Sequence, residues 1–358
     1  MSMLDWFEGF FVNETTQRKT LLSDSILESC FSETDNSVTI KEGYFNSKAI
    51  KEYPIKTKKF IYRPKSLEQY IGQDKAKSLV KLNIKKIKEL RTVNFLLSGK
   101  KGGGKTTLAY IIKNLLNATL FEHIAGELSN PDQLENIINE ISFNENGEPR
   151  PEDERVVLFL DEIHALSPKL CEIFYPIMED YQIGGKAIKP FILIGATTEK
   201  NKLLEKVSPF VDRFQVQIDL ENYTEEDIIK ILRQYNQQIY LEKIVPDIKL
   251  TIIARNCKFT PRIAITLLED CLIEENIGKV LSNHRIIKDG LTDIDFKLLK
   301  TLNDNDKPLG ENALAQILGI SQADYKQQYE PHLCEMGYIL RTPRGRLISA
   351  EGKRILNG

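Results

Sequence analysis

The chain has 358 residues, of which 41% are hydrophobic, and its formal net charge is −2. This length predicts two or three domains with buried cores. No run approaches about 20 uncharged apolar residues, and the acidic, aromatic residues 1–8 are unlike a secretory signal. The five cysteines form no Cys-x-x-Cys pair, so neither a disulfide framework nor a zinc site is indicated. We therefore expect a cytoplasmic protein without a membrane span, in which any contact with nucleic acid comes from a local basic patch.

Residues 1–58 mix aromatic, polar and charged side chains without sustained periodicity, and we interpret them as an N-terminal extension. Leu4, Phe7, Phe10 and Phe11 would lie on one face of a short helix. Such an apolar stripe packs against a neighbouring domain of its own chain or docks a partner, and the sequence leaves both open.

Residues 59–217 alternate short strand-like runs with helical ones, which predicts an α/β domain with a parallel sheet covered by helices. The predicted strands are residues 95–97, 119–121, 156–160 and 191–194. Residues 143–154 are polar and rich in helix breakers, so we expect an exposed loop there.

The last two segments predict smaller domains. Residues 218–287 are helical, with Thr224 as a cap before an acidic first turn, and we expect a separate lid domain. Residues 288–358 have the order of a winged helix. Its predicted helices lie near residues 295–302, 312–318 and 322–336, and its hairpin joins residues 338–340 to 346–349.

The run GKKGGGKT at residues 99–106 follows the first predicted strand and opens a helix, which is the context of a phosphate-binding loop. Its glycines let backbone N–H groups face a polyphosphate, while Lys105 neutralises phosphate oxygens and Thr106 can bind Mg²⁺. The sequence therefore predicts a nucleotide site.

Polar residues at the ends of two further strands complete this site. Asp161 and Glu162 end the third predicted strand, which places Asp161 beside the metal and Glu162 beside an attacking water. Thr198, or with less support Thr197, ends the next strand, where a hydroxyl can orient that water.

Two arginines follow outside these loops, Arg213 in the run DRF and Arg262 in the run TPR. An arginine stabilises charge on a transferring phosphoryl group and can act across a subunit boundary. The order of these motifs resembles that of the AAA+ ATPases, whose nucleotide sites lie between the subunits of a ring.

From about residue 60 to its end the chain more narrowly resembles the RuvB family of Holliday junction branch-migration motors. The runs that carry the resemblance are YRPKSLEQYIGQ (62–73), DEIH (161–164), LSP (166–168), YPIMED (175–180), IGATT (194–198), TPRIA (260–264), YEP (329–331) and RTPRGR (341–346). The first and the last of these are more specific to the family than the phosphate loop is.

The resemblance implies roles for individual residues. It places Tyr62, Arg63 and Ile71 around the adenine and Gly102, Gly104, Lys105, Thr106 and Thr107 on the phosphates. The same pocket would be lined by Glu179, Asp180, Tyr181 and Tyr223. Asp161 would coordinate Mg²⁺ through water and Glu162 would activate the hydrolytic water. Arg213 would act on the neighbouring subunit, and Arg262 would sense the γ-phosphate.

Arg341, Arg344 and Arg346 surround a Pro-Gly turn in the predicted wing. The resemblance implies that they contact DNA phosphates, and a compact cationic tip suits sequence-independent backbone binding. A turn whose charges are merely solvated is the alternative.

The chain departs from the family at several places. Lys100, Lys101 and Gly103 stand where the family has two prolines and a leucine, and Phe259 replaces a glycine before the lid arginine. The family grips its RuvA partner with a long hairpin, whereas residues 181–190 permit only a short one. We therefore expect a protein partner other than a standard RuvA.

Two hypotheses follow. The first is a Mg²⁺-dependent ATPase that forms a homo-oligomeric, hexameric ring and moves duplex or four-way-junction DNA. The second is an ATP-switched AAA+ scaffold or regulatory subunit of a mobile-element or defence complex, which the short hairpin and the N-terminal extension favour.

Overall fold

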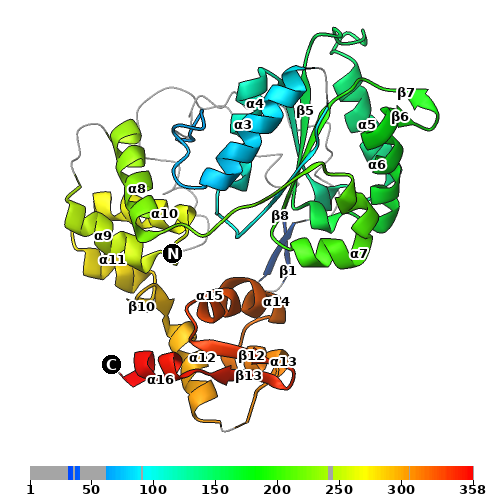
Figure 1. Cartoon of the computed structure of the whole chain (residues 1–358). Coiled ribbons are helices and arrows are strands. Elements are labelled where there is room, and N and C mark those ends of the chain that lie inside the picture. Colours follow the sequence, from blue (N-terminus) through cyan, green and yellow to red (C-terminus); the bar gives the residue numbers. More distant parts are fainter. Residues whose placement is uncertain are drawn as a thin grey trace. The chain divides into compact units, whose positions relative to one another are not determined.

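The computed structural model describes residues 31–34, 37–40, 62–89, 92–240, 245–305 and 307–357. In a first unit, Met1–Phe60, the backbone forms an antiparallel hairpin of β1 (Phe31–Thr34) and β2 (Ser37–Ile40). The predicted stripe of Leu4, Phe7, Phe10 and Phe11 lies outside the described residues. The second unit, Ile61–Gly358, carries the rest of the structure (Figure 1).

A parallel sheet of five strands organises the first part of the second unit. Its strands are β3 (Phe95–Ser98), β4 (Thr119–Ile124), β5 (Val156–Asp161), β8 (Ile192–Thr197) and β9 (Val216–Asp219). They lie in the order β4-β5-β8-β3-β9, and every neighbouring pair is parallel. The four predicted strands are confirmed. β9 was not predicted, because only two of its four residues, Val216 and Ile218, are apolar, whereas β3 begins with three consecutive apolar residues.

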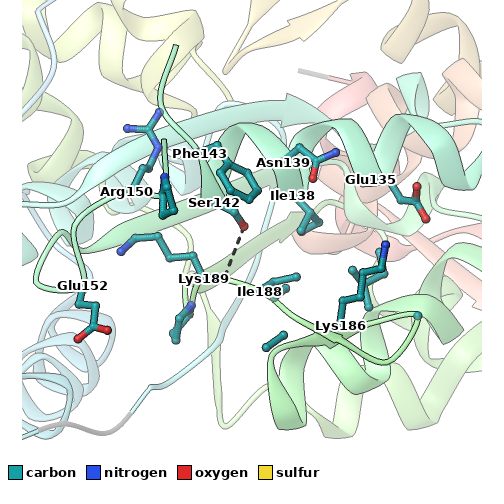
Figure 2. A pocket seen from close by; sticks show the side chains of 15 residues that line it. Glu135, Ile138, Asn139, Ser142, Phe143, Arg150, Glu152, Lys186, Ile188 and Lys189 are labelled. Atoms are coloured by element: carbon teal, nitrogen blue, oxygen red, sulfur yellow. Dashed lines mark hydrogen bonds between the residues drawn. The ribbon is translucent and has the colours of Figure 1, made fainter. Parts of the chain in front are cut away.

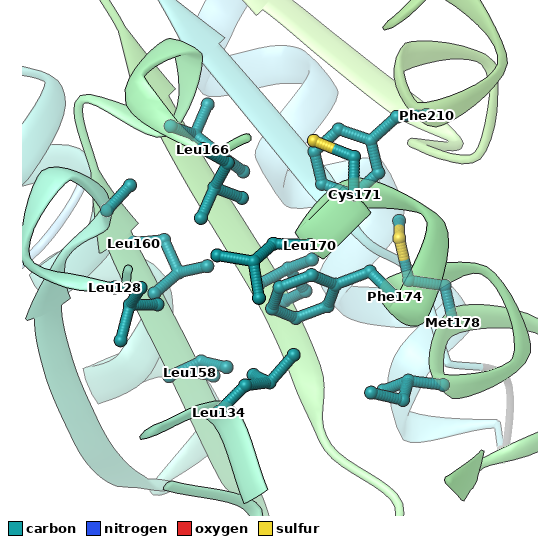
Figure 3. Close-up of a cluster of buried hydrophobic side chains, with 14 of the residues drawn as sticks. Leu128, Leu134, Leu158, Leu160, Leu166, Leu170, Cys171, Phe174, Met178 and Phe210 are labelled. Carbon is teal, nitrogen blue, oxygen red and sulfur yellow. The ribbon is translucent and has the colours of Figure 1, made fainter. Parts of the chain in front are cut away.

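Helices cover both faces of this sheet (Figure 1). They are α3 (Asp74–Lys88), α4 (Lys105–Leu116), α5 (Pro131–Ser142), α6 (Pro168–Asp180) and α7 (Lys200–Asp212), with 3-10 turns η1 (Ala125–Glu127) and η2 (Ile163–Ala165). β5 shows why both faces are covered. Val157 and Phe159 belong to the core beneath α3 and α4, whereas Leu158 and Leu160 belong to the core beneath α5, α6 and α7 (Figure 3). An uninterrupted apolar run is typical of a parallel strand buried on both sides.

An exposed loop precedes β5, and a short hairpin precedes β8. β6 (Gln182–Ile183) and β7 (Lys186–Ala187) form the predicted short hairpin, with Gly184 and Gly185 at positive φ of 54° and 77°. Glycine adopts these angles without steric cost, as a tight hairpin turn requires. The predicted loop at 143–154 is mostly exposed and is closed by a bridge between Phe143 and Pro149.

The lid consists of α8 (Glu225–Ile239), α9 (Asp247–Asn256), α10 (Pro261–Ile273) and α11 (Ile277–Asn283). Thr224 caps α8 as predicted, because its side chain accepts a hydrogen bond from the Asp227 N–H and the Asp227 side chain accepts one from the Thr224 N–H. The helices enclose a separate core that includes Ile228, Leu232 and Leu267.

The C-terminal part is the predicted winged helix. Its elements are β10 (Ile286–Lys288), β11 (Leu291–Thr292), α12 (Asp293–Asn303), α13 (Glu311–Leu318), α14 (Gln322–Asp324), η3 (Tyr325–Tyr329), α15 (Glu330–Glu335), β12 (Ile339–Thr342), β13 (Gly345–Ile348) and α16 (Ala350–Asn357). The third predicted helix is interrupted by the π-helical turn η3. Pro331 follows that turn, and its missing N–H cannot continue the regular hydrogen-bond ladder.

The lid and the winged domain are joined by a buried ion pair. Lys258 Nζ lies 2.7 Å from Oδ2 of Asp295, whose side chain is fully buried. The predicted boundaries at residues 58, 217 and 287 stay predictions. In the described part of the chain, no helix combines the length and apolarity that crossing a membrane requires.

Candidate functional site

The phosphate loop lies at the carboxyl edge of the sheet, where three neighbouring strands end. β5, β8 and β3 are adjacent, so the residues after Asp161, Thr197 and Ser98 meet at one place. Ligands of open α/β sheets bind at such an edge. The fold thus brings the predicted loop, the acidic pair and the threonines together.

Two glycines of the loop are required by close contacts. A Cβ at Gly104, whose φ is 99°, would lie 2.7 Å from the Tyr70 hydroxyl and 3.0 Å from that of Tyr223. A Cβ at Gly102, whose φ is 76°, would lie 3.0 Å from the Arg262 Cβ. The lid residues Tyr223 and Arg262 therefore lie directly against the loop.

Lys105 is a buried cation, with a relative exposure of 6%. Its ammonium donates to the carbonyl oxygens of Gly99 (2.9 Å) and Lys100 (3.1 Å). Burial lowers the pKa of Lys105, and the nearby carboxylates of Glu162 and Asp161 act in the opposite direction. A buried ammonium at the start of a helix is suited to bind phosphate oxygens. Thr106 and Thr107 follow it in the first turn of α4.

The acidic pair is held by its own neighbours. Glu162 has a left-handed φ of 50°, which is uncommon outside glycine and turns it out of the line of β5. The Thr198 hydroxyl donates to Glu162 Oε2 at 3.0 Å. Thr197 Oγ1 instead lies 3.0 Å from Nδ1 of His164. Of the two threonines, Thr198 is thus the one in contact with Glu162.

The residues around 62–71 pack between the lid and α4. The rings of Tyr62 and Tyr235 meet edge to face at 6.4 Å, and the Arg63 guanidinium lies 4.7 Å from the centre of the Tyr110 ring. Ile71 is half-buried. Contacts of Tyr62, Arg63 and Ile71 with an adenine stay predictions.

Sequence reasoning missed Tyr70 and His164. The Tyr70 hydroxyl donates to the Gly104 carbonyl oxygen at 3.3 Å, and the His164 ring lies beside Glu162. Both residues stand inside runs that carry the family resemblance, which was the available signal. Their contacts could not be deduced, because Tyr70 bonds to Gly104, 34 residues away, and the His164 ring also contacts Thr197, 33 residues away.

Arg213 and Glu179 form a pair of their own. Arg213 Nε lies 3.0 Å from Glu179 Oε1, and its guanidinium stacks 4.0 Å from the centre of the Tyr175 ring. β9 begins at Val216, which pairs with Phe95 at the amino end of β3. Arg213 closely precedes this strand start, so it lies toward the amino edge of the sheet, opposite the phosphate loop. Roles for Arg213, Glu179, Asp180 and Tyr181 at a nucleotide stay predictions, and in this fold they require the site of a neighbouring subunit.

The donors at the loop fit a hydrated Mg²⁺ ion. In the described residues, no cluster of three or more His, Cys, Asp or Glu side chains forms a metal cage. The Thr106 hydroxyl and the Asp161 carboxylate supply hard oxygen donors instead. Mg²⁺ commonly binds through one or two such groups together with substrate phosphates.

The arginines of the wing differ in their surroundings. Arg344 is exposed at the turn, and the side chain of Arg341 is 56% exposed while pairing with Glu330 at 3.2 Å. The side chain of Arg346 is only 14% exposed and is bound by both Glu330 and Glu311. The guanidinium of Arg346 therefore ties the wing to α13 and α15, and a DNA contact from it stays a prediction.

The charged side chains of this network influence one another strongly. Lys326, followed by Arg346 and Gln322, lowers the pKa of Glu311 to about 2 although partial burial opposes the shift. Glu330 is only 2% exposed, so its charge is compensated by Arg346 and Arg341.

A groove of about 1040 Å³ lies at the opposite edge of the sheet from the phosphate loop. It is lined by α5, by the loop before β5 and by the β6–β7 hairpin before β8, so it faces the amino ends of the strands. Figure 2 shows Ile138, Phe143 and Ile188 in it, with Lys186 and Glu135 at its rim. This groove is separate from the nucleotide site.

Comparisons with known proteins agree with this geometry. The family model of the Holliday junction DNA helicase RuvB P-loop domain matches residues 62–220, and that of the RuvB C-terminal winged helix domain matches residues 288–357.

Similar whole proteins were also found. The Holliday junction branch migration complex subunit RuvB of Mycoplasma genitalium is 32% identical over 316 residues, covering 83% of this chain and 98% of the relative. That of Thermotoga maritima is 32% identical over 321 residues, covering 82% and 91%. The solved structure of the Thermotoga maritima RuvB Holliday junction branch migration motor superposes with a TM-score of 0.71 at 32% identity, covering 82% of this chain and 98% of that one. The chain therefore belongs to the RuvB family.

Proposed function

We propose that this chain is an ATP-driven DNA motor that acts on duplex or four-way-junction DNA. The observation that carries the proposal is the convergence of Lys105, Glu162 and Arg262 at one edge of the sheet, in a chain that ends in a winged helix with an arginine tip. The relatives named above are branch-migration subunits, which supports the same activity here. The scaffold alternative is not favoured, because the hydrolytic residues are present at one edge of the sheet and Thr198 contacts Glu162 there.

Each residue of the site has a chemical task in this proposal. Lys105 and the first turn of α4 bind the phosphates. Thr106 and Asp161 would hold Mg²⁺, which would offset the charge of the transferring phosphoryl group. Glu162 orients a water and accepts its proton, while Thr198 holds the carboxylate in place. Arg262 reaches the loop from the lid, so hydrolysis there can move the lid.

A ring of copies, which we expect to be hexameric, completes the site. Arg213 lies toward the edge opposite its own phosphate loop, next to Glu179. In a ring it faces the nucleotide of the next subunit, where its charge stabilises the transition state.

The partner of this ring differs from a standard RuvA. The β6–β7 hairpin has only two residues in each strand, and the groove beside it is built partly from the loop at 143–154. Titration of the purified chain with a RuvA protein tests this proposal. No binding is expected, and binding that is lost on Ile188→Asp would contradict it.

Steady-state ATP turnover of the purified chain, with and without duplex DNA, tests the proposed activity. Turnover is expected to require Mg²⁺ and to respond to DNA. Lys105→Ala removes the phosphate-binding cation and is expected to lower kcat by a factor of at least about 100. Lys101→Ala, in the same loop but exposed, is the matched control and retains turnover. Equal turnover in the two variants would contradict the assignment.

A further inference from the structure

A side chain of η3 connects the winged domain to the nucleotide site. Gln327 Nε2 donates to Glu199 Oε1 at 3.2 Å. Gln327 lies in the π-helical turn, and Glu199 directly follows Thr198 and precedes α7. π turns are rare and are often found at functional positions. Through Gln327 and Glu199, the winged domain is thus joined to the strand end that carries Thr197 and Thr198.

Glu199 in turn faces the ring of His164. Glu199 Oε2 lies 3.6 Å from His164 Nε2 and 2.8 Å from Lys202 Nζ. The Glu199 N–H donates to Thr197 Oγ1 at 3.0 Å, which fixes the backbone at the same place. Lys202 and Gln327 both lower the pKa of Glu199, so a carboxylate is favoured between the two domains.

The other ring nitrogen of His164 faces the catalytic base. Nδ1 lies 3.0 Å from Thr197 Oγ1 and 3.4 Å from Glu162 Oε2. The same oxygen of Glu162 accepts the hydrogen bond from Thr198. The His164 side chain is 13% exposed, so its ring is held between two carboxylates rather than free to turn.

We propose that His164 is a positioning residue, which ties Glu162 through Glu199 to Gln327 of the winged domain. A movement of the winged domain on DNA then changes the position of the catalytic base. This inference rests on the proposed motor function. His164 touches no reacting atom, and its effect comes from the orientation of the Glu162 carboxylate, on which the geometry of water attack depends.

A second contact of the same domain does not pass through His164. Glu335 on α15 pairs with Lys100 of the phosphate loop. The winged segment 325–335 thus contacts the nucleotide site at two places, which provides an internal comparison. Of these two contacts, the one made by Gln327 continues to Glu162 through the side chains of Glu199 and His164.

A double-mutant cycle on ATP turnover of the full chain tests the link. His164→Ala is expected to lower basal kcat on the order of tenfold with KM nearly unchanged. Gln327→Ala is expected to change kcat by about threefold when His164 is present, and not at all in the His164→Ala background. His164→Asn restores a hydrogen-bond donor toward Glu162 but not toward Glu199. Basal kcat is therefore expected to recover, whereas Gln327→Ala is expected to leave kcat unchanged in this background.

Matched variants separate the link from a general effect on the winged domain. Gln328→Ala removes the neighbouring glutamine, whose amide donates to Asp324 at the end of α14, and is expected to leave kcat unchanged. Glu335→Gln is expected to act equally with and without His164. Equal effects of Gln327→Ala in both His164 backgrounds would overturn the inference. Failure of the unsubstituted chain to bind duplex DNA would instead contradict the proposed function.

Discussion

At the scale of single residues, Lys105 and Glu162 take their places from local motifs, whereas Arg346 takes its place from ion pairs with distant segments. Lys105, Asp161 and Glu162 could be assigned because a phosphate loop and a strand-ending acidic pair define their positions along the chain. Arg346 shows the limit of this reasoning. It was grouped with Arg341 and Arg344 by its place in the wing, but pairing with the buried Glu330 depends on a helix 16 residues away in the sequence.

His332 is a buried titratable residue that no motif indicated. It lies on α15, is 5% exposed, and burial followed by the charge of Lys258 lowers its pKa from 6.5 to about 4. Between these pH values the unfolded chain binds a proton that the folded chain does not. The free energy of unfolding therefore falls as the pH drops from about 6.5 to about 4, by about 3 kcal/mol for this group.

The measurement is the urea midpoint of unfolding at pH 7.5 and at pH 5. His332→Leu fills a similar volume without a titrating group, so it is expected to reduce the loss of stability between these pH values. An unchanged difference between the two midpoints in the variant would show that other groups set the pH dependence.

Among elements, strands and lid helices were predictable because their apolar patterns are local. β5 was recognisable from five consecutive apolar residues, and α8 from its Thr224 cap. β9 and η3 were not predictable. β9 has only two apolar residues and is set by its pairing with β3, and η3 precedes Pro331, which lacks a backbone N–H. At Lys258 and Phe259, before α10, the backbone has φ of 50° and 52°, an uncommon conformation for residues other than glycine.

The wing is the element whose arginines can be separated by experiment. Arg341→Ala with Arg344→Ala is expected to weaken duplex binding on the order of tenfold and to reduce the slope of log affinity against log salt by about two. Fluorescence anisotropy over a salt series measures both. Arg354→Ala, another exposed arginine of the winged domain, serves as the control and leaves the affinity unchanged.

Arg346→Ala is expected to act on stability instead. It leaves the Glu330 carboxylate buried with one partner fewer, which lowers the free energy of unfolding by about 3 kcal/mol. A variant that is fully stable but binds DNA as weakly as the Arg341/Arg344 double variant would show that Arg346 contacts DNA directly.

At the scale of the whole molecule, the order of domains could be predicted, and the contacts between them could not. The sheet, the lid and the winged helix follow in the predicted order. Lys258 pairs with Asp295, 37 positions away, and Gln327 bonds to Glu199, 128 positions away. No sequence motif at these residues indicates either contact. The position of Arg213 away from its own loop is likewise a property of the fold, and it leads to a prediction about assembly.

Mixing two inactive variants tests whether Arg213 acts on a neighbour. In a randomly mixed ring of Lys105→Ala and Arg213→Ala subunits, a site is intact when its own loop is unsubstituted and the adjacent subunit supplies the arginine. Equal amounts are therefore expected to restore about a quarter of the unsubstituted ATP turnover. Turnover no greater than that of the separate variants would place Arg213 in the site of its own subunit.

The separation of a synthetic four-way junction into duplexes tests the motor most directly. Fluorescently labelled junction DNA is incubated with the unsubstituted chain or the Lys105→Ala variant, with ATP and Mg²⁺, and the products are resolved by electrophoresis. Separation by the unsubstituted chain only, and only with ATP, is the predicted result. ATP hydrolysis that depends on Lys105 while the junction stays intact would contradict the central claim.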